Sequence, residues 1–230
     1  MSIPARSKKD LFRKQQIEWI KIGAIWGIML PGLAYIDFMY KNPIIYTVYI
    51  AVCYFAIKLT LKIRGHSAKL SADYKLMQQL EGIDSNMRVF SQFKVEAGKK
   101  EAKIEWVLVS KLGIWCVKVN IMPGKISGKE KEKNWCQVLK PKNPKSKTLS
   151  FPNPVLEVQY EAKRLKEYLR HKLKENIPVF PLVVFAKAEE LDVPFTSEAV
   201  LLANLGKVFK NKDLREVPTE TLDKVTSLLC

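Results

Sequence analysis

The sequence is poor in the residue types that most often build metal and disulfide sites. It holds only 2 histidines and 4 cysteines among 230 residues. The cysteines, which form no C-x-x-C pair and have no histidine pair beside them, are Cys53, Cys116, Cys136 and Cys230. This spacing suggests neither a zinc site nor a disulfide framework, and it fits a reducing compartment. The chain also lacks an internal repeat.

Acidic residues are outnumbered by basic ones. There are 39 lysines and arginines against 23 aspartates and glutamates, which gives a formal charge of +16. A strongly basic protein has polyanions as natural partners, either nucleic acid or the anionic headgroups of a membrane, and the charge alone does not choose between them. Hydrophobic residues make up 47% of the chain, which is enough for a packed core and excludes disorder as the class.

Two long apolar runs lie near the N-terminus. They cover about residues 20–40 and 44–61, and a short polar link separates them. Each is about as long as a helix must be to cross roughly 30 Å of hydrocarbon. The sequence therefore predicts two transmembrane helices within residues 19–62. A buried helical hairpin of a soluble protein is the alternative.

Flanking charge predicts how this hairpin is oriented. Basic residues precede the first run and follow the second, whereas the link carries one lysine. The positive-inside rule then places both termini in the cytoplasm, so that residues 1–18 form a basic cytoplasmic segment and the protein lies in the cell's inner membrane. The apolar run is too long for a signal peptide, and no small-residue cleavage site follows it.

From about residue 67 the pattern is that of a mixed α/β domain, which we place in the cytoplasm and extend to residue 230. A short amphipathic helix is predicted from Leu70 to Gly82. The strand-like runs are 87–95, 103–109, 113–119, 134–139, 179–186 and 200–205. A long helix is predicted at 155–175 and a closing helix at 218–229, while the rest of 124–150 is lysine-rich and weakly patterned. This order predicts helices packed on a sheet in three layers.

Several fragments in one order give the domain a family resemblance. They are I-E-W-V-L-V-S at 104–110, G-I-W-C-V-K-V-N at 113–120, G-K-I-S-G at 124–128, Trp135, N-P at 153–154 and L-V-V-F-A at 182–186. Together they resemble the NERD domain, the nuclease-related domain, over about residues 69–193. The resemblance implies a restriction-endonuclease-like three-layer fold with a mixed sheet.

The resemblance also implies where a catalytic site would lie. In that family a helix begins with Gly-Glu, a strand carries Ile-Asp and the next strand ends in Glu-x-Lys, and the carboxylates would hold Mg²⁺ or Mn²⁺. The corresponding positions here are Asp73, Glu105, Lys118 and Asn120. Glu157 stands where the family often has glutamine.

Two of these positions depart from the chemistry that a metal nuclease needs. Lys118 replaces a metal-binding carboxylate with a cation, and Asn120 replaces the ammonium group with a neutral amide. We therefore expect a degenerate site with no catalytic residue and no cofactor, in which Glu105 pairs with Lys118. The alternative is an atypical metal-dependent nuclease that uses Glu105 and Asp73.

The lysines of the weakly patterned segment are the sequence's candidates for nucleic-acid binding. They are Lys125, Lys129, Lys131, Lys133, Lys140, Lys142, Lys145 and Lys147. A charged loop can also be merely solvated, or lie on anionic lipid. Trp106 and Trp135 are expected in the core rather than stacked on bases. The expected role is the binding of nucleic acid or a protein partner, and a scaffold subunit of a membrane complex is a further alternative.

Overall fold

The computed structural model describes residues 8–39, 43–84, 86–97, 100–139, 146–194, 197–210 and 216–229. The chain divides into two units, a helical unit, Lys8–Tyr74, and a second unit that contains Lys75–Cys230 and is called the globular unit below. Each unit is described by itself.

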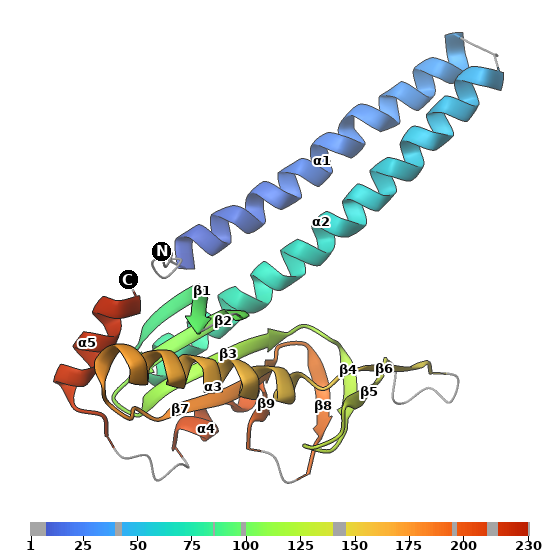
Figure 1. The fold of residues 1–230 in the computed structure, drawn as a ribbon. Coiled ribbons are helices and arrows are strands. Elements are labelled where there is room, and N and C mark those ends of the chain that lie inside the picture. The colour runs from blue at the N-terminus through green and yellow to red at the C-terminus, as the bar shows by residue number, and fades with distance from the viewer. Residues whose placement is uncertain are drawn as a thin grey trace. The chain divides into compact units, whose positions relative to one another are not determined.

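The helical unit consists of α1 (Lys8–Met39) and the greater part of α2 (Pro43–Ile83) (Figure 1). The two helices run antiparallel: the ring of Phe12 lies 6.2 Å from that of Tyr74, and the Tyr49 hydroxyl donates to the carbonyl of Met29 at 2.5 Å. Pro31 lies inside α1 without ending it. The sequence is therefore right in placing two helices at these positions.

Their predicted membrane-spanning character is not supported. Within the part of the chain that the structure describes, no helix is both long and apolar enough to cross a membrane. Residue 40 of the first predicted span and residues 41–42 of the link lie outside the described residues, as do the side chains of 30, 33–39 and 43–46.

The boundary predicted within α2 is wrong. The second apolar run and the amphipathic segment that follows it belong to one helix of 41 residues. Gly65 is the only glycine or proline between them, and a single glycine costs a helix only about 1 kcal/mol, so the helix continues through it. It ends at Ile83, directly after Gly82, close to the predicted stop.

The globular unit is built on a five-stranded sheet in the order β1-β2-β3-β7-β9. Its strands are β1 (Arg88–Ala97), β2 (Lys100–Ser110), β3 (Gly113–Asn120), β7 (Val179–Phe185) and β9 (Ala199–Leu201). The pairs β1-β2 and β2-β3 are antiparallel, whereas β3-β7 and β7-β9 are parallel. Parallel strands need a long crossover, and the one from β3 to β7 contains three strands of a second sheet and a helix.

That second sheet has four strands in the order β6-β5-β4-β8. They are β4 (Gly124–Ser127), β5 (Asn134–Val138), β6 (Thr148–Pro152) and β8 (Ala188–Asp192). Gly124 has a φ of +85°, and a Cβ there would run into the carbonyl of Val138 on β5. The sequence predicted only β5 of these four strands.

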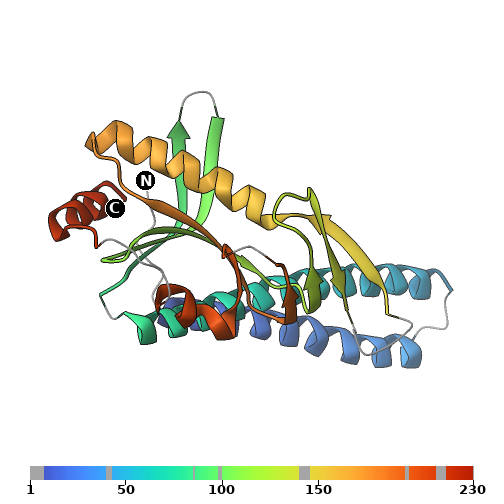
Figure 2. The ribbon, with the colours of Figure 1, turned by 90° about the horizontal axis from the view of Figure 1, so that it is seen from below.

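Helices cover both faces of the main sheet. The buried face of α3 (Pro154–Leu173) contributes Val158, Ala162 and Leu165 to the core, together with residues of α5 (Thr219–Leu229). On the other face, the ring of Trp115 lies 4.9 Å from that of Phe209 in α4 (Leu205–Lys210). Figure 2 shows α3 and α4 on opposite sides of the sheet. The predicted mixed α/β class is confirmed.

The strand predicted at 200–205 is shorter in the structure. β9 stops at Leu201, and residues Leu202–Asn204 form the 3-10 turn η1 that leads into α4. The helix predicted at 155–175 is present as α3, and Asn153 caps it by accepting the N–H of Val155 at 2.9 Å, as the Asn-Pro pair predicts.

Candidate functional site

Glu105 lies where the main sheet becomes irregular. The β2-β3 ladder runs from Ser110 opposite Gly113 to Trp106 opposite Val117. One residue beyond that last pair, the side chain of Glu105 accepts the backbone N–H of Val119 at 3.3 Å. The carboxylate thus takes the place of a strand partner.

The neighbouring strand is also irregular at this point. Register pairs join Ser91 to Trp106 and Phe93 to Ile104, but Gln92, which comes between them, is not paired in this ladder and has a φ of +56°. A left-handed backbone costs a residue with a side chain about 1–2 kcal/mol, so this part of the sheet is strained. The break falls opposite Glu105, and strain of this kind is a frequent feature of functional sites.

Lys118 and Asn120 lie on the same face of β3 as Ile114 and Cys116, which belong to the core beneath α3. The Lys118 ammonium forms an ion pair with the carboxylate of Glu157, in the first turn of α3. The ion-pair partner of Lys118 that the structure shows is Glu157, whereas the sequence analysis expected Glu105. The sequence could not indicate this because three strands of the second sheet, β4, β5 and β6, separate β3 from α3 along the chain.

Asn120 serves the turn at the end of β3. Its side-chain oxygen accepts the backbone N–H of Met122 at 2.8 Å, and its backbone carbonyl accepts the N–H of Ala186 at 2.8 Å. An asparagine that bonds the backbone two residues on stabilises a turn. Asn120, for which the resemblance implied a lost catalytic lysine, thus serves local structure.

Glu161 lies one turn after Glu157 on α3, and Lys118, Glu157 and Glu105 are the charges that act on it. We call these four residues the Lys118 cluster. The side chain of Glu161 is buried, with 7% exposed, and its Oε2 has no hydrogen-bond partner. Burial raises the pKa of Glu161 from about 4.5 to about 7; Lys118 acts in the opposite direction, and Glu157 and Glu105 add to the rise. Burial, together with the charge of Glu161, also raises the pKa of the Cys116 thiol well above its usual range.

Sequence reasoning missed Glu161, although a signal was present. The residue falls on the apolar stripe of α3 with Val158, Ala162 and Leu165, where a carboxylate is out of place. Its distance of four residues from Glu157 puts both on neighbouring turns of one side of the helix. Asp73, the remaining candidate, lies in α2 within the helical unit, with 6% exposed.

The cluster does not fit a divalent metal. Mg²⁺ and Mn²⁺ need several oxygen ligands around one point, and an ammonium group there repels them. Lys118 is already paired with Glu157, and the described residues contain no group of three or more His, Cys, Asp or Glu side chains able to hold a metal ion.

Five of the eight lysines predicted to bind nucleic acid lie in the described part of the chain. Lys125 is paired with Glu190 at 2.8 Å and Asp192 at 3.4 Å, and Lys129 lies 3.8 Å from Glu132. The others in the described part are exposed: Lys131, Lys133 and Lys147. Lys140, Lys142 and Lys145 lie outside the described residues.

Both tryptophans are in the core, as the sequence predicts. Trp135 is fully buried, donates to the carbonyl of Lys129 at 2.9 Å and stacks on Phe185 with ring centroids 6.2 Å apart. Trp106 is 3% exposed. Neither ring offers a face on which a base could stack.

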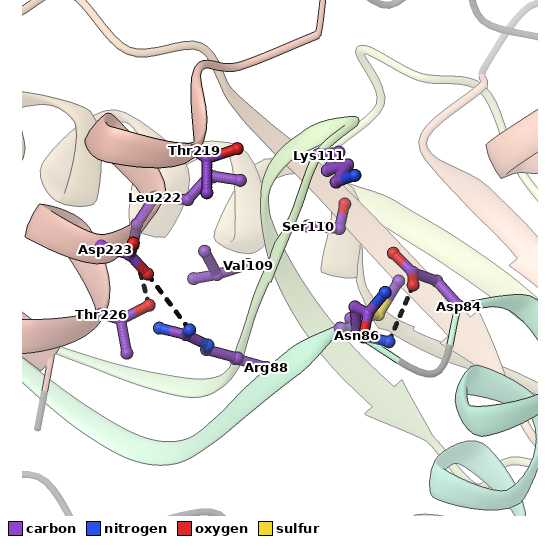
Figure 3. A pocket seen from close by; sticks show the side chains of 11 residues that line it. Asp84, Asn86, Arg88, Val109, Ser110, Lys111, Thr219, Leu222, Asp223 and Thr226 are labelled. Carbon is purple, nitrogen blue, oxygen red and sulfur yellow. Dashed lines mark hydrogen bonds and ion pairs between the residues drawn. The ribbon is translucent and has the colours of Figure 1, made fainter.

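A pocket of about 460 Å³ lies away from this cluster, against α5 and the turn between β2 and β3 (Figure 3). Ser110 and Lys111 line it from the turn, and Arg88 and Asp223 form an ion pair of 3.1 Å on its α5 side. It contains none of the residues of the Lys118 cluster.

The globular unit is a mixed α/β domain whose main sheet is covered by helices. An acidic residue on its second strand and a polar end of its third strand beneath a helix are consistent with a nuclease-like class. Comparison with protein families makes the assignment more specific: residues 64–186 match NERD, the nuclease-related domain, over more than half of the chain. The chain belongs to this family. Comparisons with curated proteins and with solved structures gave no match.

Proposed function

We propose that this protein is a catalytically degenerate member of the family that binds nucleic acid without cutting it. The observation that carries the proposal is the ion pair between Lys118 and Glu157, at the position where the family's carboxylates would hold a metal. The chain thus supplies its own cation to these carboxylates, and it needs no divalent ion to neutralise them.

The charge of the chain supports the binding part of the proposal. A net charge of +16 attracts phosphate backbones, and binding driven by phosphate contacts needs no catalytic centre. A protein partner is the alternative ligand. The atypical nuclease is the alternative activity; it would have to displace Lys118 from its carboxylate.

We also propose that the helical unit attaches the protein to the cytoplasmic face of a membrane. The support is a set of large apolar side chains on α2 that are 47–70% exposed: Val48, Ile50, Val52, Tyr54, Phe55, Ile57, Leu59 and Leu61. Their spacing places them in two stripes along α2, and exposed apolar surface of this extent marks a contact with lipid or with another protein. The basic residues that flank the hairpin in the sequence favour the cytoplasmic side. If the apolar surface instead binds other subunits, the protein is a scaffold of a membrane complex.

The test is a nuclease and binding assay on the full chain in mild detergent. Labelled single strands and duplexes of DNA and RNA are incubated with Mg²⁺ or Mn²⁺, and binding is followed over a salt series. We expect no cleavage and a linear fall of log affinity with log salt. Metal-dependent cleavage that disappears in Glu105→Ala would overturn the degenerate site. Absence of both binding and cleavage would favour the scaffold.

A further inference from the structure

The outer face of α3 carries a row of cations. Lys163, Lys166, Arg170 and Lys174 are all exposed, and they are spaced by three, four and four residues. Lys163, Lys166 and Arg170 lie on one side of α3, and Lys174 follows at its end as the left-handed C-cap residue. At about 1.5 Å per residue, the helical part of the row, from Lys163 to Arg170, is about 10 Å long. We call these four residues the α3 row.

The α3 row has no acidic counterpart. None of its four members forms an ion pair with another described residue, and Glu167, which lies beside the row, is paired with Arg164 at 3.2 Å. Like charges at a spacing of four residues destabilise a helix by a few tenths of a kcal/mol per pair. A face that serves only solubility usually mixes both signs.

The helix dipole explains only part of the row. Cations are stabilised near the last turn of a helix, where Arg170 lies and after which Lys174 follows. Lys163 and Lys166 are in the middle of the 20-residue helix, where this effect has faded. Their position suggests a ligand with regularly spaced negative charges.

An aromatic side chain continues the row toward the start of α3. Tyr160 is 45% exposed, and the Arg164 guanidinium lies over its ring, 5.3 Å from the centroid. An exposed ring beside a line of cations is the combination with which proteins bind single-stranded nucleic acid, because each base offers a face for stacking. A lipid surface would instead favour apolar side chains beside the cations.

We propose that the α3 row, with Tyr160, is the surface on which this protein binds a single strand of nucleic acid. The proposal rests on the proposed function and moves the interface from the lysines of the second sheet to α3. Among the described lysines of the segment 125–147, only Lys131, Lys133 and Lys147 are exposed and have no ion pair.

Two variants of equal charge separate the surfaces. One carries Lys163→Gln, Lys166→Gln and Arg170→Gln, and the other carries Lys131→Gln, Lys133→Gln and Lys147→Gln. Binding of the full-length proteins to fluorescein-labelled poly-dT is measured by anisotropy at about 50 to about 200 mM salt. Thermal melting shows that each variant folds. Lys163→Arg with Lys166→Arg, which keeps the charge, is expected to bind as the parent does.

Each lost phosphate contact lowers the salt slope for a single strand by about 0.7, so the α3 variant is expected to lose about 2 units of slope. Between about 50 and about 200 mM salt, the fold-loss of affinity is then about 20 times smaller for the α3 variant than for the parent. The second-sheet variant should keep the parent's slope. Tyr160→Ala should weaken binding at least about 5-fold without changing the slope.

The opposite pattern, in which only the second-sheet variant loses slope, would overturn this inference and leave the proposed function intact. A parent that binds no oligonucleotide at low salt would overturn both. If the parent, but not the α3 variant, prefers phosphatidylserine vesicles to phosphatidylcholine vesicles while binding no oligonucleotide, the row is a lipid surface and the inference is wrong.

Discussion

The buried carboxyl of Glu161 predicts a specific dependence of stability on pH. Its pKa is about 7 in the folded protein, chiefly because of burial, against an ordinary value of 4.5. A group whose pKa is raised on folding binds its proton more tightly in the folded state. The free energy of unfolding that it contributes is therefore full below about pH 4.5 and is lost as the pH rises to about 7. At about 1.4 kcal/mol per pKa unit, the loss is about 3 kcal/mol.

Glu161→Gln removes this loss, because the amide has the shape of the protonated acid and carries no charge at any pH. We expect the variant to match the parent at about pH 4.5 and to be more stable by about 3 kcal/mol at about pH 8. Urea unfolding at the two pH values, followed by tryptophan fluorescence, measures the difference. Trp106, Trp115 and Trp135 are buried in the globular unit and report its unfolding.

Glu167→Gln is the matched control, since it makes the same change of charge on the same helix at a position paired with Arg164 near the surface. It should give no comparable gain at about pH 8. The reasoning fails if Glu161→Gln gives no gain there, or if it gives equal gains at both pH values. Either result would mean that the buried side chain carries no unfavourable charge.

Three further predictions concern the same sheets. Lys118→Glu combined with Asn120→Lys should create a site whose Mn²⁺ binding is visible by calorimetry, and a titration identical to that of the parent would contradict the account of the site. Gln92→Gly should raise the free energy of unfolding by about 1 kcal/mol, whereas Gln92→Ala should not, because only glycine adopts a positive φ without strain. Gly128→Ala should lower it by about 2 kcal/mol, since its Cβ would enter the ring of Trp135; an unchanged melting temperature would contradict this packing.

The parts of the fold that the sequence predicts well are those whose pattern is local. The runs that became β1, β2 and β3 show apolar residues between clear turn signals, and the turn into β3 uses Gly113 at a φ of +119°. The bounds of β7 and α3 lie within two residues of their predicted ends. The family follows from the order of these pieces.

The parts that the sequence does not predict depend on distant contacts. β4, β6 and β8 have four or five residues each and little alternation, so only their pairing within the second sheet, β6 with β5 and β4 with β5 and β8, identifies them as strands. The partner of Lys118 is likewise decided by how α3 lies on the sheet. The burial of Glu161 could have been suspected from its place on an apolar helical face.

Lys118 and Asn120 at the end of β3 each have a structural role, which would make the metal site that the family resemblance implies hard to restore. A metal ion neutralises carboxylates but can dissociate, whereas Lys118 is part of the strand and is held by Glu157 on α3. Restoring a carboxylate at 118 alone would bring a further negative charge to Glu105, Glu157 and Glu161 without a cation, which is costly near a buried group. Restoring lysine at 120 alone would remove the side chain that accepts the N–H of Met122. Each single reversion is therefore expected to destabilise the metal-free domain, and the carboxylate at 118 is the change that would give a divalent ion a further ligand.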